Sequence, residues 1–169
     1  MEIWDGYYAD GTLAGVDLVR GEEIPAGLYH IVCEILVQHT DGDILLMQRD
    51  LNKPNYAGMF ESSAGGSALK SEDPLSCAIR ELQEETGIVQ KDLKLIGTSC
   101  SAHSLYYNYF CITDIPKDAV TLQEGETISY RWISEEDFIR FIHSGQMIPS
   151  QKLHYRDYFR TKGYMEDEV

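Results

Sequence analysis

The first clear pattern along the chain is a pair of short apolar runs divided by a polar turn. The turn is Thr40-Asp41-Gly42-Asp43, and the second run is Ile44-Leu45-Leu46-Met47. The first run is rich in β-branched residues and contains Ile31, Val32, Ile35, Leu36 and Val37. Two β-prone runs joined by a short Gly/Asp turn predict a hairpin.

The segments on either side of this hairpin have weaker patterns. Residues 1–28 are rich in Gly, Asp and Glu with scattered aromatics, which predicts short strands and turns ahead of the core. Residues 48–66 have few periodic apolar positions, and their Pro54, Gly58, Gly65 and Gly66 predict a loop that needs close backbone approach.

Apolar residues at helical spacing predict a helix over residues 74–86. Asp73 is placed to cap it, Pro74 suits the first turn, and Gly87 suits the C-terminal stop. The predicted buried stripe consists of Leu75, Ala78, Ile79 and Leu82.

The remaining pattern alternates strands with helices. Strands are predicted at residues 93–98, 106–113 and 129–133. A helix is predicted to begin at Ser134, and another amphipathic stretch, over residues 151–160, is also predicted to be helical. The acidic tail 166–169 is expected to be frayed. Mixed strands with helices between and after them predict an α+β or αβα layered fold. We expect one domain over residues 1–169, with residues 1–28 as an N-terminal strand and turn extension and residues 29–169 as the core.

Charge narrows the class of partner. The formal net charge is −14, so a basic footprint for duplex nucleic acid is not expected. An acidic protein that handles anionic phosphates needs an added cation, and a bound divalent metal is the usual one. The four cysteines have neither zinc spacing nor a CxxC pair, so we expect reduced thiols. The sequence has no long apolar span and no signal-like start, so we expect no membrane partner and a cytoplasmic location.

The predicted helix carries an acidic cluster. Glu81, Glu84 and Glu85 lie three and four residues apart and share a face, where like charges cost ~0.2–0.5 kcal/mol per pair. Arg80 can pair with Glu84, and the remaining charge suits a hard cation such as Mg²⁺ or Mn²⁺. A solvated acidic face is the alternative interpretation of three glutamates alone.

The spacing around this cluster decides between the two interpretations. Gly66 is followed after five residues by Glu72 and, after seven more, by Arg80-Glu81-Leu82-x-Glu84-Glu85-x-Gly87-Ile88. This pattern resembles the Nudix box at every defined position. The resemblance implies an αβα sandwich with a mixed sheet and a metal-dependent hydrolase of diphosphate linkages.

By position, the resemblance implies that Glu81, Glu84 and Glu85 are metal ligands, with the Gly65 carbonyl as a further one, and that Arg80 and Glu72 orient them. Bound metal would offset charge in an in-line displacement and activate a water, whose proton a carboxylate accepts. We take Glu84 and Arg80 as catalytic residues. Glu126, in the loop before the strand at 129–133, is the preferred general base over its neighbour Glu124, with plain surface acidity as the alternative.

The region upstream is similar to the isopentenyl-diphosphate isomerase branch of the same superfamily. That similarity implies that His30 is a metal ligand and that Arg49 or Lys53 contacts the diphosphate. The simpler interpretation of His30 is a hydrogen-bonded histidine, and that of Arg49 is a surface ion pair. The isomerase uses a cysteine near a histidine just before the box, where this chain has Glu61-Ser62-Ser63-Ala64-Gly65-Gly66-Ser67. We therefore expect hydrolysis of a small-molecule diphosphate, such as a nucleoside diphosphate derivative.

Two functional alternatives to hydrolysis stay open at this point. One is isomerisation of a prenyl diphosphate, and the other is a non-catalytic Nudix module that binds its ligand. The complete set of box carboxylates favours catalysis over a binding module. We expect a homodimer from the family resemblance, and the extended, aromatic N-terminal segment is suited to forming an interface between two copies.

Overall fold

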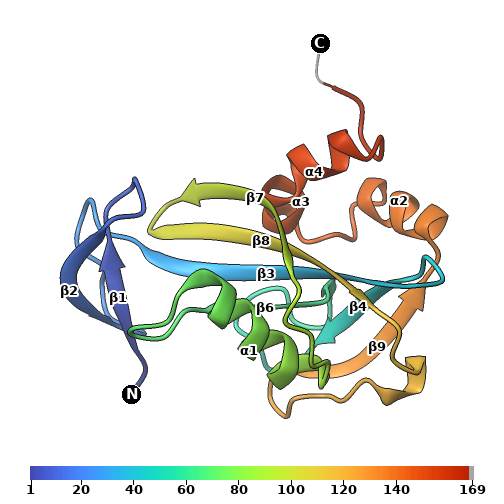
Figure 1. Cartoon of the computed structure of the whole chain (residues 1–169), viewed down its shortest axis with the longest axis horizontal. Helices are drawn as coiled ribbons and strands as arrows, with labels where there is room; N and C mark the ends of the chain where they lie inside the picture. Colours follow the sequence, from blue (N-terminus) through green and yellow to red (C-terminus); the bar gives the residue numbers. More distant parts are fainter. Residues whose placement is uncertain (168–169) are drawn as a thin grey trace.

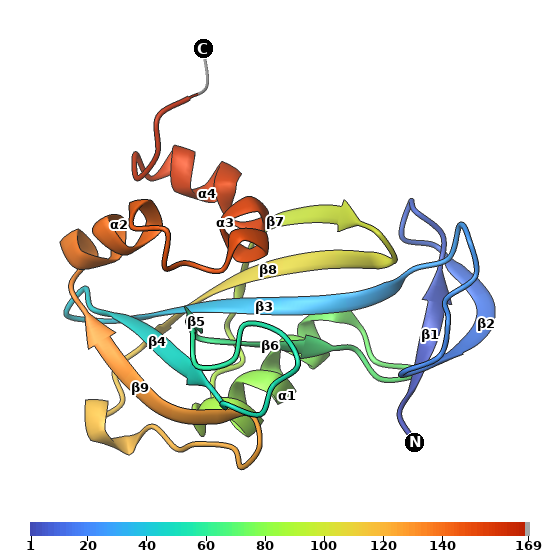
Figure 2. The same cartoon turned by 180° about the vertical axis from the view of Figure 1, so that it is seen from behind.

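The fold is an α+β sandwich built on a mixed β-sheet, seen in a computed structural model that describes residues 1–167 (Figures 1 and 2). The elements along the chain are β1 (Ile3–Tyr7), β2 (Leu13–Val19), β3 (His30–His39), β4 (Ile44–Arg49), β5 (Phe60–Ser62), β6 (Ala64–Ser67), α1 (Pro74–Thr86), β7 (Lys94–Ser101), β8 (Ser104–Thr113), the 3₁₀ turn Lys117–Ala119, β9 (Thr127–Ile133), α2 (Glu135–His143), α3 (Pro149–His154) and α4 (Arg156–Thr161).

Strand β3 is the centre of the sheet. The order is β5-β4-β3-β8-β7, with β6 also paired to β3 and β9 to β4. Strands β3 and β8 run parallel from His30↔Ser104 to His39↔Thr113. The other pairings of the sheet are antiparallel. The sheet is therefore mixed, as predicted.

The predicted hairpin is only partly formed. Strands β3 and β4 appear where expected, but they pair through Gln38↔Ile44 alone and then diverge. They diverge because β6 pairs with the edge of β3 that faces β4, and β5 pairs with the edge of β4 that faces β3. The predicted loop at 48–66 was wrong in the same region, since it contains β5 and the start of β6. These short strands lack apolar alternation, and their pairing is decided by the neighbouring backbones.

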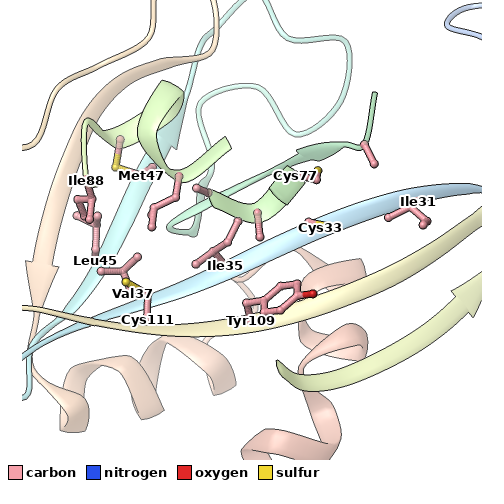
Figure 3. Packing of buried hydrophobic residues seen from close by; sticks show 14 of the residues in the cluster. Ile31, Cys33, Ile35, Val37, Leu45, Met47, Cys77, Ile88, Tyr109 and Cys111 are labelled. Atoms are coloured by element: carbon pink, nitrogen blue, oxygen red, sulfur yellow. The ribbon is translucent and has the colours of Figure 1, made fainter. Parts of the chain in front are cut away.

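Helices cover both faces of the sheet (Figure 1). On one face α1 packs over a core of residues from β3, β4 and β8, shown in Figure 3, which includes Cys33, Ile35, Leu45, Met47 and Cys111. On the other face Leu36 and Ile44 pack with Phe138, Ile142 and Phe159 from the C-terminal helices. Successive residues of β3 thus serve opposite cores, as a strand buried on both faces requires.

Helix α1 begins and ends where the sequence predicts. The Asp73 side chain accepts a hydrogen bond from the backbone N–H of Ser76 at 2.8 Å, and Gly87 ends the helix with a φ of 76°. One part of the predicted stripe was wrong, because Leu75 is 39% exposed. Leu75 lies on the same side of the helix as the buried Leu82 and Thr86, but in the first turn, at the N-terminal end of the buried stripe.

The chain termini pack against this core. The β1–β2 hairpin docks on the turn before α1, where the backbone N–H of Ser71 donates to Asp5 at 2.6 Å. Ser134 caps α2 as predicted, and the stretch predicted at 151–160 forms two short helices instead of one. The predicted frayed tail lies partly outside the described residues. Within residues 1–167, no helix is both long and apolar enough to cross a membrane.

Candidate active site

Arg80 forms hydrogen bonds with several carboxylates of the acidic cluster on α1. Its guanidinium donates to both carboxylate oxygens of Glu72 at 2.8 and 2.9 Å and to the Ser67 carbonyl at 3.1 Å. It also donates to Glu81 at 2.8 Å and to Glu84 at 3.2 Å. These carboxylates hold the pKa of Arg80 above its ordinary value, with the bonds to Glu72 contributing most. One cation therefore orders three carboxylates.

Two of the box glutamates are withdrawn from solvent. Glu85 is 6% exposed, and its carboxylate accepts a hydrogen bond from the backbone N–H of Gly65 at 3.0 Å. Burial raises the pKa of Glu85 well above its ordinary value, and repulsion from Glu61 adds to the rise. Burial likewise raises the pKa of Glu81, against the pull of Arg80. Both carboxylates would be stabilised in their ionised forms by a further cation.

The two glycines before the box allow backbone and carboxylates to approach closely. A Cβ at Gly66 would lie 2.6 Å from Oε2 of Glu81 and closer still to its Cδ and Oε1. A Cβ at Gly65 would lie 2.8 Å from the carbonyl oxygen of Cys33 on β3. The predicted need for close backbone approach at these glycines is thus met by α1 on one side and β3 on the other.

These groups surround a cavity of about 260 Å³. Its acidic wall is formed by Glu81, Glu84 and Glu85 of α1 together with Glu61 and Glu126. The basic residues that also line it are Arg20, Arg49, Lys53 and Arg80. A cavity with both signs of charge is suited to a ligand that carries phosphate and a cation together.

The substrate-contact and general-base candidates from the sequence line this same cavity. Lys53 forms an ion pair with Glu126. Arg49 donates to Glu61 at 3.0 Å and to the carbonyl of Asn55 at 3.1 Å. Fold contacts thus bring residues 49, 53 and 126 beside the α1 carboxylates, although they are far apart in the sequence.

Three charged residues of the cavity were not predicted from the sequence: Glu2, Arg20 and Glu61. Glu61 lies on β5, inside the segment predicted as a loop, and burial raises its pKa. Glu2 and Arg20 pair at 3.0 Å beside the β1–β2 hairpin. No local motif marks them, and only the pairing of β5 with β4 and the docking of the hairpin bring them to the site.

Other candidates lie elsewhere. His30 stacks on Trp4 with ring centroids 4.0 Å apart, and its Nε2 is 3.0 Å from the hydroxyl of Ser104. Burial lowers the pKa of His30 to about 4. His30 does not line the acidic cavity, so the hydrogen-bonded interpretation holds for it. Glu124 is exposed and outside the cavity, whereas Glu126 lines it.

The acidic cavity offers oxygen donors of the kind that a divalent metal binds. Among residues 1–167, no three His, Cys, Asp or Glu side chains are already gathered as a ligand set. Arg80 holds Glu81, and the carboxylates surround the cavity without converging on one point. Their oxygen donors and the raised pKa values of Glu81 and Glu85 nevertheless fit a hard divalent cation. Glu81, Glu84, Glu85 and the Gly65 backbone are the groups that could hold it.

Comparison with known proteins places the chain in a family. The profile of the NUDIX domain matches residues 28–156. An uncharacterized Nudix hydrolase of Listeria monocytogenes is 32% identical over 154 residues, covering 88% of this chain and 89% of the relative. The chain therefore belongs to the Nudix hydrolase family, and the resemblance inferred from the box is confirmed.

Two further similarities bear on the fold and the branch. An isopentenyl-diphosphate Delta-isomerase of Corynebacterium diphtheriae is 27% identical over 128 residues, covering 68% of this chain and 69% of that protein. A crystal structure of a Deinococcus radiodurans protein superimposes with a TM-score of 0.72 at 16% identity, covering 92% of this chain and 98% of the other. The latter confirms the αβα fold that the box implies.

Proposed function

We propose that this protein is a divalent-metal-dependent hydrolase that cleaves the diphosphate linkage of a small molecule. The observation that carries the proposal is the cavity that carboxylates of α1 line together with Arg49 and Lys53. The raised pKa values of Glu81 and Glu85 support it, because a bound cation would relieve the cost of their ionisation. Membership of the Nudix hydrolase family supports the reaction type.

In this proposal, Mg²⁺ or Mn²⁺ would be held by Glu81, Glu84, Glu85 and the Gly65 carbonyl. The metal would neutralise charge on the diphosphate and activate a water molecule. Arg80 positions Glu81 and Glu84 through bonds of 2.8 and 3.2 Å. Glu72 in turn fixes the guanidinium of Arg80 with two bonds of its own. This layered arrangement resembles the support that metal ligands generally have.

Lys53 and Glu126 have a linked role in the proposal. In the ligand-free protein the Lys53 ammonium is paired with the Glu126 carboxylate. A substrate phosphate that draws Lys53 toward itself frees Glu126 to accept the proton of the attacking water. Arg49, which is held by Glu61 at 3.0 Å, offers a second cationic contact to the diphosphate.

The N-terminal hairpin belongs to the same functional unit in our proposal. Glu2 and Arg20 line the cavity although they precede the region matched by the family profile. We accordingly treat residues 1–169 as one domain with a single site.

The sequence similarity to an isomerase makes isomerisation the second candidate. That reaction needs a thiol near the site, and no cysteine lines the acidic cavity among the described residues. Cys33 on β3 and Cys77 on α1 are fully buried, and the hydrogen bond between them and burial raise the pKa of Cys33. The chemistry available in the cavity therefore favours hydrolysis.

The test is a Mg²⁺/Mn²⁺-dependent screen over nucleoside diphosphates, dinucleotides, nucleotide sugars and isopentenyl diphosphate, with the products resolved by anion-exchange chromatography. We expect cleavage that stops on metal removal and in Glu84→Gln but continues in Glu124→Gln, an exposed carboxylate on the neighbouring loop. Activity unaffected by Glu84→Gln contradicts the assigned site. Ligand binding without turnover supports a non-catalytic module, and double-bond isomerisation without phosphate release supports the second candidate.

A further inference from the structure

A single serine hydroxyl lies at the point where β3 and β4 separate. The register of the two strands pairs Gln38 with Ile44, so the next pair would be Val37 with Leu45. Within these described strands, pairing stops one step earlier. Instead, the backbone N–H of Val37 donates to the Ser63 hydroxyl at 2.9 Å, and that hydroxyl donates to the Leu45 carbonyl at 2.8 Å. The hydroxyl therefore takes the place of a main-chain contact and links the two strands across the gap.

The chain changes its partner strand at the same residue. Ser62 pairs with Leu46 of β4, whereas Ala64 pairs with Ile35 of β3. Ser63, which lies between them, connects β5 to β6. These two short strands thus enter the sheet through the gap that the Ser63 hydroxyl spans.

The backbone conformation of Ser63 is unusual for a residue with a side chain. Its φ is 56°, in the left-handed region, and the residue is fully buried. Its backbone N–H donates to the Glu61 carbonyl at 3.0 Å, which closes a tight turn. A non-glycine residue keeps such a conformation only where its surroundings hold it, and strained residues of this kind cluster at functional sites. The two bonds of the hydroxyl supply that hold.

The residues two positions before and after Ser63 both line the acidic cavity. Glu61 accepts a hydrogen bond from Arg49 at 3.0 Å. Gly65 donates its backbone N–H to Glu85 at 3.0 Å. Ser63 is not among the described residues that line the cavity. A change in the backbone at Ser63 would therefore reach the cavity through Glu61 and Gly65.

We propose that Ser63 is a positioning residue, which places the Gly65 backbone and the Glu61 carboxylate by bridging the gap between β3 and β4. The inference rests on the proposed function, in which the Gly65 carbonyl is a metal ligand. Ser63 acts through the backbone of β6 and contacts neither metal nor substrate. A serine that served stability alone would leave the metal affinity of the folded protein unchanged when it is replaced.

A Mn²⁺ titration followed by the electron paramagnetic resonance signal of the free ion tests the proposal. Ser63→Ala leaves the Val37 N–H and the Leu45 carbonyl without their partner. We expect it to bind Mn²⁺ at least about tenfold more weakly than wild type, because loss of a group that orients metal ligands typically costs about 10–100-fold in affinity. Ser62→Ala is the matched control, since Ser62 is equally buried and its hydroxyl has no hydrogen-bond partner within residues 1–167. It should bind Mn²⁺ as wild type does.

Ser63→Gly separates the hydroxyl from the backbone conformation. Glycine adopts a positive φ without strain but offers no bridge between the strands. We expect this variant to lose Mn²⁺ affinity at least about tenfold as well, and it takes the place of Ser63→Ala if that protein does not fold. Wild-type affinity in either folded variant overturns the inference.

Hydrogen exchange of the Gly65 amide is a second measurement, which needs no metal. In Ser63→Ala or Ser63→Gly this amide should exchange at least about tenfold faster than in Ser62→Ala, relative to the amide of Ile142 in the core beside α2. Equal relative exchange refutes the inference. If the wild type binds no Mn²⁺, the proposed function fails by itself, and the exchange of Gly65 still decides whether Ser63 positions it.

Discussion

Gly66 offers the sharpest perturbation of the candidate site, because its alanine variant pushes directly on one carboxylate. The added Cβ would lie 2.6 Å from Oε2 of Glu81 and nearer to two other atoms of that group. The backbone of Gly66 has no positive φ, so the strain arises from Glu81 alone. An ordinary contact needs about 3.5 Å, so the carboxylate must move by roughly 1 Å.

That movement breaks the 2.8 Å bond between Arg80 and Glu81. Charge-assisted hydrogen bonds contribute about 1.5–3 kcal/mol, and the group can find water instead, so we expect Gly66→Ala to lose about 1–2 kcal/mol of unfolding free energy. The effect on catalysis should be larger, because a misplacement of about 1 Å at a catalytic group costs roughly 100-fold in rate.

The assay combines urea unfolding with metal-dependent turnover of the best substrate from the screen. Gly97→Ala is the matched control, since a Cβ at Gly97 in β7 meets no atom within 4 Å and the backbone there has no positive φ. It should retain wild-type turnover. If Gly66→Ala retains turnover within about threefold of Gly97→Ala, Glu81 is not held where catalysis requires it.

Three further variants test the packing and charge around the site. With the metal removed by a chelator, Glu85→Gln should raise the unfolding free energy by about 1 kcal/mol at pH 8. The reason is that burial raises the pKa of Glu85 and the amide removes the buried charge. A large loss of stability would contradict this. The pKa of His30 is lowered to about 4, so the stability that the neutral imidazole contributes is complete above about pH 6.5 and is lost as the pH falls toward 4. His30→Phe should therefore reduce the fall of the unfolding free energy over this pH range by about 1–3 kcal/mol. An unchanged pH dependence would refute the assignment. Gly87→Ala places a Cβ 2.5 Å from the Thr121 hydroxyl, so it should cost at least about 1 kcal/mol more than Gly125→Ala, whose φ is similar and whose surroundings are open; equal costs would show that the backbone alone matters.

The local features of the fold were predictable because they depend on neighbouring residues. The cap at Asp73, the stop at Gly87 and the acidic face of α1 all follow from helical spacing and short-range hydrogen bonds. The strands β8 and β9 were visible as apolar runs. The spacing from Gly66 to the box identified the family, which the comparisons then confirmed.

The features that were missed depend on contacts between distant segments. Glu61 becomes a partly buried acid only because the short strand β5 pairs with β4. The sequence Phe60-Glu61-Ser62 has no apolar alternation that would predict a strand. Arg20 reaches the cavity only through the docking of the β1–β2 hairpin. The buried pair of Glu34 with Asn108 likewise depends on the register of β3 against β8, which no local pattern encodes.

The central claim is that the carboxylates of α1 hold a divalent metal. Its most direct test is a Mn²⁺ titration followed by the electron paramagnetic resonance signal of the free ion, with wild type, Glu85→Gln and the exposed control Glu124→Gln compared at one pH. We expect wild type and Glu124→Gln to bind Mn²⁺ alike and Glu85→Gln to bind at least about tenfold more weakly. Equal binding by all three proteins, or none by the wild type, would contradict the account.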